Sequence, residues 1–510
     1  MHTKVNSGGV LGVNAYSIDV EVDVSGGLPS FSVVGLPDAS IRESRDRIRS
    51  AIKNSGFYFP RIKITANLSP ADIKKEGIGF DLPIAIGILG ATSVFKQEEL
   101  DGIVFCGGLS LNGKLKYFRG GLPIAMSLKK SFSSFIMPKR SAYEAANIPG
   151  IFAHGADSLA EVVEHIKKIT PIETITIPPR KEAANRPYNG LDFNDVKGQE
   201  HVKRGLEIAA SGNHNILLLG PPGSGKSMLA KRFPSILPDL TAQEALETTN
   251  VYSVAGKIKT AGLLYERPFR APHHTISYAA MAGGGSWPLP GEISLAHNGI
   301  LFLDEFPEFR RDVLETLRQP LESGKITIAR VNQALEYPSR FLLISAMNPC
   351  PCGYFTDPIK KCQCSANQIQ RYLSKISGPL LDRIDLHLEV PRLKYNELSQ
   401  KRMGETSGVI KTRVIKNRQL QGKRFDYKPA RGSYNAYMTS KEIEKFCILS
   451  QDAKLILKEA ILELGISARA YDKILKISRT ISDMDSSETI ETTHISEAIS
   501  YRSLDKSLWT

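Results

Sequence analysis

The 510-residue chain has little cysteine and no long hydrophobic run, and each shortage excludes a class of protein. Six cysteines are too few for a disulfide-stabilised scaffold. The longest apolar stretch, Leu82 to Phe95, is shorter than a membrane-spanning helix and contains Pro83, so we expect no membrane segment. The first 25 residues lack a basic segment followed by an apolar core, so we expect no secretory signal and a cytoplasmic protein.

Positive charge is what the chain has in excess. Lys and Arg number 66 and Asp and Glu number 53, which leaves a formal net charge of +13. This excess favours a polyanionic partner such as DNA, although ribosomal contact or a merely soluble basic surface is also compatible with it.

The pattern of apolar residues predicts an α/β protein with three domains and one linker. Short alternating strands mixed with helical segments predict an α/β domain over residues 1–168. Three prolines without helical periodicity predict an extended linker over residues 169–190. Strand-like runs alternating with helices predict a parallel-sheet nucleotide-binding core over residues 191–393. Over residues 394–510 only helical spacing remains, so we expect a helical domain there.

A phosphate-binding loop is the strongest motif of the chain. An apolar run precedes it and a helical segment follows, a context that a chance glycine-rich turn would lack. Backbone amides of such a loop surround phosphate oxygens, its lysine contacts the β- and γ-phosphates, and its final hydroxyl binds Mg²⁺. The residues that fit the pattern G-x-x-x-x-G-K-[ST] are Gly220, Pro221, Pro222, Gly223, Ser224, Gly225, Lys226 and Ser227.

Polar side chains follow two further strand-like runs. Asp304 and Glu305 come directly after the run from Ile300 to Leu303, at the end of a strand where α/β sheets bind ligands. We expect Asp304 to hold Mg²⁺ through water and Glu305 to orient or deprotonate the attacking water. Asn348 follows the run from Phe341 to Ala346 and is placed to contact the γ-phosphate or that water. Taken alone, Asn348 would be a turn residue before a proline.

Two arginines are candidates for stabilising the charge of phosphoryl transfer. Arg383 lies in the segment from Gly378 to Asp385, and Arg469 lies near a predicted helix start in the last domain. Cations placed near the γ-phosphate favour this kind of transition state. The alternative for each is an ordinary surface salt bridge.

Together these motifs resemble the AAA+ ATPases of the magnesium-chelatase-related branch, and over nearly the whole chain they resemble the ComM/YifB-type competence protein family. The residues that carry the resemblance are GPPGSGKS, ILFLDE, the terminal Asn of SAMN, PLLDRID and SARAYDKILKISRTISD, with supporting stretches at Arg267 to His274, Pro349 to Gly353 and Gly35 to Asp38.

The resemblance implies a hexameric ring that binds ATP and Mg²⁺ at its subunit interfaces. Arg383 would then be the finger supplied to the neighbouring subunit, and Arg469 the second sensor within its own subunit. It also implies an ATP-driven DNA helicase that promotes branch migration of recombination intermediates in natural transformation. The helical C-terminal domain would be the lid of the AAA+ core.

The N-terminal domain resembles the proteolytic domain of Lon. Gly79 takes the place of the Lon catalytic serine, and Pro123 takes the place of the lysine. Peptide cleavage needs a nucleophile and a base, so we expect no peptidase activity and a structural or partner-binding role.

Basic residues in two loops are candidates for DNA contact, with weakly sequence-selective and salt-dependent binding. The first loop spans residues 267–290 and carries Arg267, Arg270, His273, His274 and a run of glycines. The second is the alternating stretch that begins at Lys325 and ends at Arg330. Residues 401–431 add ten Lys or Arg against two acids, which predicts either a DNA contact or a solvated helix face.

Four cysteines form two close pairs, Cys350 with Cys352 and Cys362 with Cys364. Four thiolates in one loop suit a structural Zn²⁺ ion. The C-x-C spacing is tighter than the usual zinc motif, however, and the alternative is four reduced thiols without a metal.

Two other functions are compatible with an ATPase core. One is a magnesium-chelatase motor subunit that drives metal insertion with partner subunits, although the known motor resembles the core without the N-terminal extension. The other is a scaffold that uses ATP only to assemble. Stimulation of ATP hydrolysis by forked DNA would favour the helicase over both.

Overall fold

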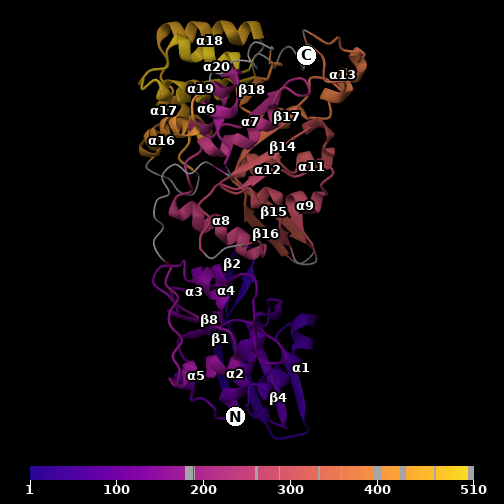
Figure 1. Ribbon diagram of the computed structural model, residues 1–510, viewed down its shortest axis with the longest axis vertical. Coiled ribbons are helices and arrows are strands. Elements are labelled where there is room, and N and C mark those ends of the chain that lie inside the picture. Colours follow the sequence, from indigo (N-terminus) through magenta and orange to yellow (C-terminus); the bar gives the residue numbers. More distant parts are fainter. Residues whose placement is uncertain are drawn as a thin grey trace.

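The computed structural model describes residues 1–177, 188, 190–258, 262–285, 288–330, 333–355, 357, 359–393, 404–425, 432–464 and 467–502. Three parts follow one another along its long axis: an N-terminal α/β part, a central part built on a parallel sheet, and a C-terminal group of helices (Figure 1). Half of the linker predicted at 169–190, residues 178–187 and 189, lies outside the described residues.

The N-terminal part is a seven-stranded mixed sheet with helices, and its strand order is β3-β4-β2-β1-β5-β8-β9. Inward-facing residues alternate along its strands, as in β2, where Ile18, Val20 and Val22 are fully buried. The apolar run noted in the sequence forms α2, which is buried nearly throughout. The elements are β1 (His2–Leu11), β2 (Asn14–Ser25), β3 (Ser30–Val34), α1 (Ala39–Asn54), β4 (Lys63–Ser69), α2 (Asp81–Ala91), β5 (Ile103–Phe105), β6 (Gly108–Leu109), β7 (Leu115–Lys116), α3 (Gly121–Leu128), β8 (Ser134–Pro138), α4 (Lys139–Ala145), β9 (Phe152–Ala156) and α5 (Leu159–Ile166).

The central part contains a five-stranded parallel sheet of order β11-β14-β17-β10-β18. Strands β10, β14 and β17 are buried at every residue, as expected for a parallel sheet covered on both faces. Its elements are α6 (Glu200–Gly212), β10 (Ile216–Leu219), α7 (Lys226–Arg232), α8 (Ala242–Val254), β11 (Phe269–Arg270), α9 (Tyr278–Ala282), β12 (Gly283–Gly284), β13 (Leu289–Pro290), α10 (Glu292–Leu295), β14 (Ile300–Leu303), α11 (Arg311–Glu315), α12 (Arg318–Ser323), β15 (Lys325–Arg330), β16 (Gln333–Pro338), β17 (Leu342–Met347), α13 (Ala366–Leu373), α14 (Gly378–Leu381) and β18 (Leu386–Glu389).

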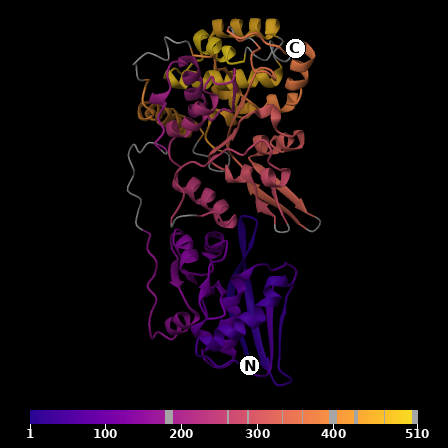
Figure 2. The same cartoon turned by 45° about the vertical axis from the view of Figure 1, so that its right-hand side comes forward.

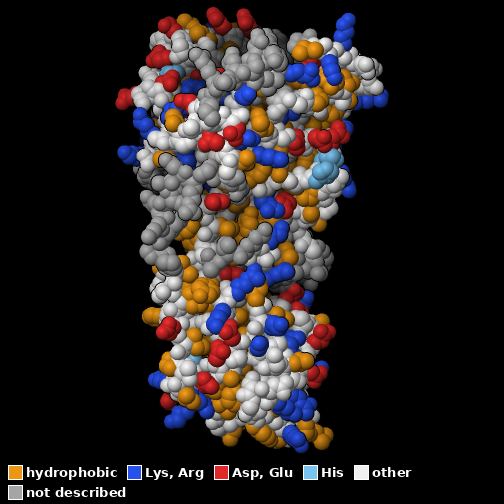
Figure 3. Space-filling model, viewed as in Figure 1, with side chains coloured by type: hydrophobic (Ala, Val, Ile, Leu, Met, Phe, Trp, Pro, Cys, Tyr) orange, Lys and Arg blue, Asp and Glu red, His pale blue; other side chains and the backbone are white. Residues whose placement is uncertain are grey.

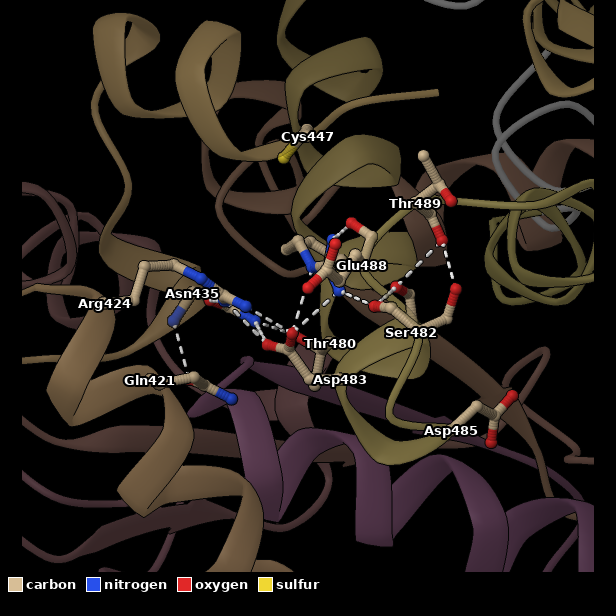
Figure 4. A network of polar contacts seen from close by, with 12 residues as sticks. Gln421, Arg424, Asn435, Cys447, Thr480, Ser482, Asp483, Asp485, Glu488 and Thr489 are labelled. Atoms are coloured by element: carbon tan, nitrogen blue, oxygen red, sulfur yellow. Dashed lines mark hydrogen bonds and ion pairs between the residues drawn. The ribbon is translucent and has the colours of Figure 1, made fainter. Parts of the chain in front are cut away.

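The C-terminal part is helical within its described residues, with α16 (Ser407–Arg424), α17 (Ser440–Phe446), α18 (Gln451–Leu464), α19 (Ala468–Met484) and α20 (Thr492–Ser500). A buried carboxylate joins these helices (Figure 4). Asp483 accepts hydrogen bonds from Arg424 at 2.7 Å, from Asn435 at 2.8 Å and from Arg479 at 3.0 Å. Because a buried charge is tolerated only when it is paired, this network fixes α16 to α19.

The N-terminal and central parts touch through specific polar contacts. The turn between β1 and β2 reaches the central part (Figure 2), where the side-chain amide of Asn250 donates to the carbonyl of Val13 at 2.8 Å. The Ser253 hydroxyl donates to Glu144 at 2.6 Å. The N-terminal part therefore contacts α8 of the central part. Among the described residues, none of the helices combines the length and the apolar character needed to cross a membrane.

Candidate nucleotide-binding site

The predicted phosphate loop connects the carboxyl end of β10 to the start of α7. Gly223 and Gly225 have φ angles of +75° and +94°, a region where only glycine is unstrained. Gly220 lies so close to β18 that an added Cβ would approach the Val390 carbonyl to 2.2 Å. The glycines are thus needed for the course of the loop.

Lys226 folds back over this loop. Its Nζ donates to the carbonyls of Gly220 at 2.6 Å and Pro221 at 2.9 Å, and to Asn348 Oδ1 at 3.1 Å. Burial lowers the pKa of Lys226 to about 8, an effect that the negative charge of Asp304 only partly offsets. The hydrogen-bond partners of the ammonium are therefore neutral oxygens. The negative charge of a bound triphosphate would stabilise the ammonium further.

Ser227 and Asp304 meet beside the loop, and the serine hydroxyl donates to the Asp304 carboxylate at 2.6 Å. Hydroxyl and carboxylate oxygens are the hard donors that Mg²⁺ prefers. This pair of residues therefore fits a magnesium ion bound together with nucleotide phosphates.

Glu305 is the residue after Asp304, and its backbone has a left-handed φ of +53°. This conformation is uncommon for a residue other than glycine and occurs often at functional sites. The Glu305 carboxylate is 58% exposed, and one of its oxygens lies 3.0 Å from His274 Nδ1. The ring of His274 in turn contacts that of His273, with the ring centres 4.1 Å apart and the planes tilted by 34°. The general base predicted from the sequence is thus held by a histidine.

Sequence reasoning placed His274 in a DNA-binding loop and did not single out Gln199. Gln199 lies just before α6, and its side-chain amide donates to the Ser224 carbonyl of the phosphate loop at 2.7 Å. Its left-handed backbone, with φ of +57°, turns the chain into α6. No spacing in a single sequence marks either contact, because each joins segments far apart in the chain.

Arg383 lies at the opposite end of the sheet from the phosphate loop. Its carbonyl accepts from the side chain of Asn215 at 3.1 Å, and Asn215 precedes β10 whereas the phosphate loop follows it. Its guanidinium pairs with Glu322. Burial, with the nearby cations of Arg318 and Arg469, lowers the pKa of Arg383.

Arg469 lies at this same end of the sheet. Its Nη1 is 3.6 Å from the carboxylate of Asp382, and its side chain is 66% exposed. One turn later on α19, Lys473 pairs with Asp385 at 2.8 Å, beside the start of β10. This position does not support the expectation that Arg469 contacts the nucleotide of its own subunit, because within one chain the length of β10 separates it from the phosphate loop.

Two of the predicted DNA contacts are internal ion pairs. Arg267 is 9% exposed, pairs with Glu244 at 3.1 Å and donates to two carbonyls. Arg270 makes a two-pronged pair with Glu292, at 2.6 and 2.7 Å. Both belong to the region of β11, at the edge of the core sheet. The Arg267 guanidinium is buried in the fold, which does not support the expectation that it binds DNA, whereas the Arg270 side chain is 29% exposed and its DNA contact stays a prediction.

The second predicted loop is a hairpin of β15 and β16, in which Lys325 pairs across the strands with Glu336 at 2.9 Å while remaining 59% exposed. Arg330 ends β15, and its side chain lies outside the described residues. In the basic segment predicted at 401–431, the described lysines Lys416 and Lys423 are exposed, whereas the arginines make contacts within the chain. Arg413 pairs with Glu207 and Glu405, and Arg418 is buried against α6.

The four clustered cysteines come together after β17. The sulfur atoms of Cys350, Cys352, Cys362 and Cys364 all lie within 4.8 Å of one another, and none of them is in a disulfide.

Family profiles match three consecutive parts of the chain. Residues 20–141 match the profile described as subunit ChlI of magnesium chelatase, residues 192–398 match the profile of magnesium chelatase subunit ChlI, and residues 404–502 match the ChlI C-terminal profile. Together these matches cover the phosphate loop, Asp304, Asn348 and Arg383.

Individual relatives extend the likeness over the full length. The chain is 44% identical to competence protein ComM of Haemophilus influenzae over 97% of this chain and 96% of ComM. It is 44% identical to YifB of Escherichia coli over 100% of this chain and 97% of YifB. The 38 kDa subunit of magnesium chelatase from Rhodobacter capsulatus is 24% identical over 34% of this chain and 53% of that subunit.

Proposed function

The chain belongs to the ComM/YifB family of magnesium-chelatase-related AAA+ ATPases, and from this premise we propose that it is an ATP-driven DNA translocase that promotes branch migration of recombination intermediates. The observation that carries the proposal is the extent of the likeness to ComM, which is named a competence protein and matches 97% of this chain. Uptake of foreign DNA ends in recombination, so natural transformation is the setting we propose.

ATP hydrolysis begins with the phosphate loop, whose amides and Lys226 hold the β- and γ-phosphates. Ser227 and Asp304 would hold Mg²⁺, which when bound neutralises phosphate charge. Glu305 orients and deprotonates the attacking water, and Asn348, linked to Lys226 at 3.1 Å, senses the γ-phosphate. The contact of His274 with one oxygen of the Glu305 carboxylate competes with the attacking water for that oxygen. We propose that DNA binding releases it.

Completion of the site by a neighbouring subunit is supported by the position of two arginines. Arg383 and Arg469 are remote from the phosphate loop of their own chain, yet both are at one edge of the core. A head-to-tail ring brings that edge to the next subunit's nucleotide and closes by rotation. We propose a hexameric ring in which both arginines act on the neighbour, so that hydrolysis depends on assembly.

DNA contact is proposed for the β15–β16 hairpin, through Lys325 and Arg330. The hairpin lies on the side of the core sheet toward the N-terminal part and keeps an exposed lysine at its base. On the face drawn in Figure 3, Lys and Arg side chains are interspersed with Asp and Glu, so no single basic stripe marks a DNA track there. We therefore propose that DNA is contacted by hairpins inside the channel of the ring and not by a basic stripe on the outer surface.

A chelatase motor subunit is the second candidate, since the matching profiles are those of chelatase subunit ChlI. The chelatase subunit from Rhodobacter capsulatus, however, aligns with only 34% of this chain. For the N-terminal part we propose a structural or partner-binding role without peptidase activity, because Gly79 and Pro123 hold no nucleophile or base.

The test is the ATPase rate of the purified chain with and without forked DNA. We expect branched DNA to raise kcat at least several-fold and the stimulation to fall steeply with salt. An ATPase indifferent to DNA would contradict the proposal and favour the chelatase motor or a scaffold. Glu305→Gln is the matched control, which should bind ATP and hydrolyse it at least ~100-fold more slowly.

A further inference from the structure

We propose that Cys350, Cys352, Cys362 and Cys364 bind one Zn²⁺ ion. We further propose that this ion holds the segment that follows Asn348 in the chain against the phosphate loop. The proposal concerns a metal site and does not depend on DNA being the substrate.

The sulfur positions have the dimensions of a tetrahedral site. The Sγ atom of Cys350 lies 3.4 Å from that of Cys352 and 3.6 Å from that of Cys362, and the Cys352–Cys362 separation is also 3.6 Å. Zinc–sulfur bonds of ~2.3 Å in tetrahedral geometry place the sulfurs about 3.8 Å apart. Four thiolates are therefore arranged so that one ion contacts all of them, despite the short C-x-C spacing.

Backbone amides around the cluster point at the sulfurs. The amide of Phe355 donates to Cys350 at 3.3 Å, that of Cys352 to Cys364 at 3.4 Å, and that of Cys364 to Cys362 at 3.4 Å. Donors directed at metal-binding sulfur stabilise its negative charge and orient the ligand. Four reduced thiols without a metal would gain little from this arrangement, since a neutral thiol is a weak acceptor.

The position of the cluster indicates what the metal does. Cys350 is buried and follows Asn348 by two residues, so its attachment fixes the end of β17. The backbone at Gly353 lies against the phosphate loop, where an added Cβ would approach Pro222 Cδ to 2.5 Å. Ser365, the residue after Cys364, caps α13. The metal would thus join β17, the phosphate loop and α13.

Metal analysis of the full-length wild-type protein tests the site. We expect about one equivalent of zinc after gel filtration, and X-ray absorption with sulfur neighbours at ~2.3 Å. Substitution with Co²⁺ should give the absorption of a tetrahedral thiolate site. Less than ~0.3 equivalents of zinc after mild preparation, or a coloured iron centre in its place, would overturn the proposal.

Variants then test the role. Cys362→Ser should lose the metal and weaken ATP binding at least ~10-fold, whereas the buried, remote Cys447→Ser should keep both. If Cys362→Ser does not fold, removal of zinc from the wild type by a strong chelator is the substitute, with nucleotide affinity as the readout. Unchanged ATP affinity in a metal-free, folded protein would overturn the fastening role, and this result would leave the DNA proposal untouched.

Discussion

Lys226 illustrates how one residue's surroundings prepare it for a ligand. The residue is 8% exposed. Its ammonium group donates hydrogen bonds to two backbone carbonyls and to a side-chain amide oxygen, and none of these three partners is a carboxylate. Burial is costly for an ammonium group, which is why the pKa of Lys226 falls to about 8. Phosphate charge reverses this cost, so binding of the nucleotide and protonation of the lysine are coupled.

The pH dependence of ATP binding follows from this coupling. Bound phosphates favour the protonated lysine, so ATP binding takes up a proton near pH 8, and affinity falls as pH rises above about 8, approaching tenfold per pH unit. Calorimetric titration in buffers of different ionisation enthalpy measures both effects. Lys226→Arg is the control, because its charge does not titrate in this range. A wild-type affinity that is flat between about pH 7 and 9.5 would contradict the assignment.

The burial of Arg267 indicates that this residue stabilises the fold. Arg267→Ala removes the cation paired with the partly exposed Glu244 carboxylate and leaves the Pro238 and Asn298 carbonyls without their donor, so it should cost about 2–4 kcal/mol of stability. Thermal and urea unfolding measure the loss. Lys325→Ala, which removes an exposed cation, should cost less than about 1 kcal/mol. If the folded Arg267→Ala protein lost DNA binding with its stability unchanged, the original DNA assignment would be restored.

At the scale of elements, the ends of β11 and β14 bring His274 and Glu305 together. We expect His274→Ala to raise the DNA-independent kcat a few-fold and to reduce the ratio of DNA-stimulated to basal rate, because Glu305 is released without DNA. His274→Gln, which can still donate a hydrogen bond, should restore much of the restraint. Equal losses of the basal and stimulated rates in His274→Ala would mean that the histidine only supports the fold.

The secondary-structure elements also explain which site residues could be predicted from the sequence. The phosphate loop, Asp304 and Asn348 were predictable because each follows a buried strand, and parallel strands place their carboxyl ends at one edge. The pairs of Arg267 with Glu244, of Arg270 with Glu292 and of Arg413 with Glu207 were not, because each joins residues at least 22 positions apart in the chain. Net charge counts cations but says nothing of which are neutralised internally. The position of Arg469 depends on how α19 packs against the start of β10, which no local pattern encodes.

At the scale of the whole molecule, hydrolysis should require two subunits. Arg383→Ala should bind ATP without hydrolysing it, and Lys226→Ala should lose ATP binding. Mixing the two should restore part of the activity, because a Lys226→Ala subunit supplies Arg383 to an intact phosphate loop. Steady-state ATPase measured across mixing ratios checks this. The double variant Lys226→Ala/Arg383→Ala is the matched control and should rescue nothing, and an absence of rescue by Lys226→Ala would contradict the proposal that Arg383 acts on the neighbour.

The most direct test of the central claim is a branch-migration assay with a labelled four-way junction, ATP and the purified full-length chain. We expect assembly into a ring and ATP-dependent conversion of the junction to product duplexes, with no conversion by Glu305→Gln. A wild-type protein that stays monomeric and hydrolyses no ATP when saturated with Mg²⁺, ATP and junction would contradict it.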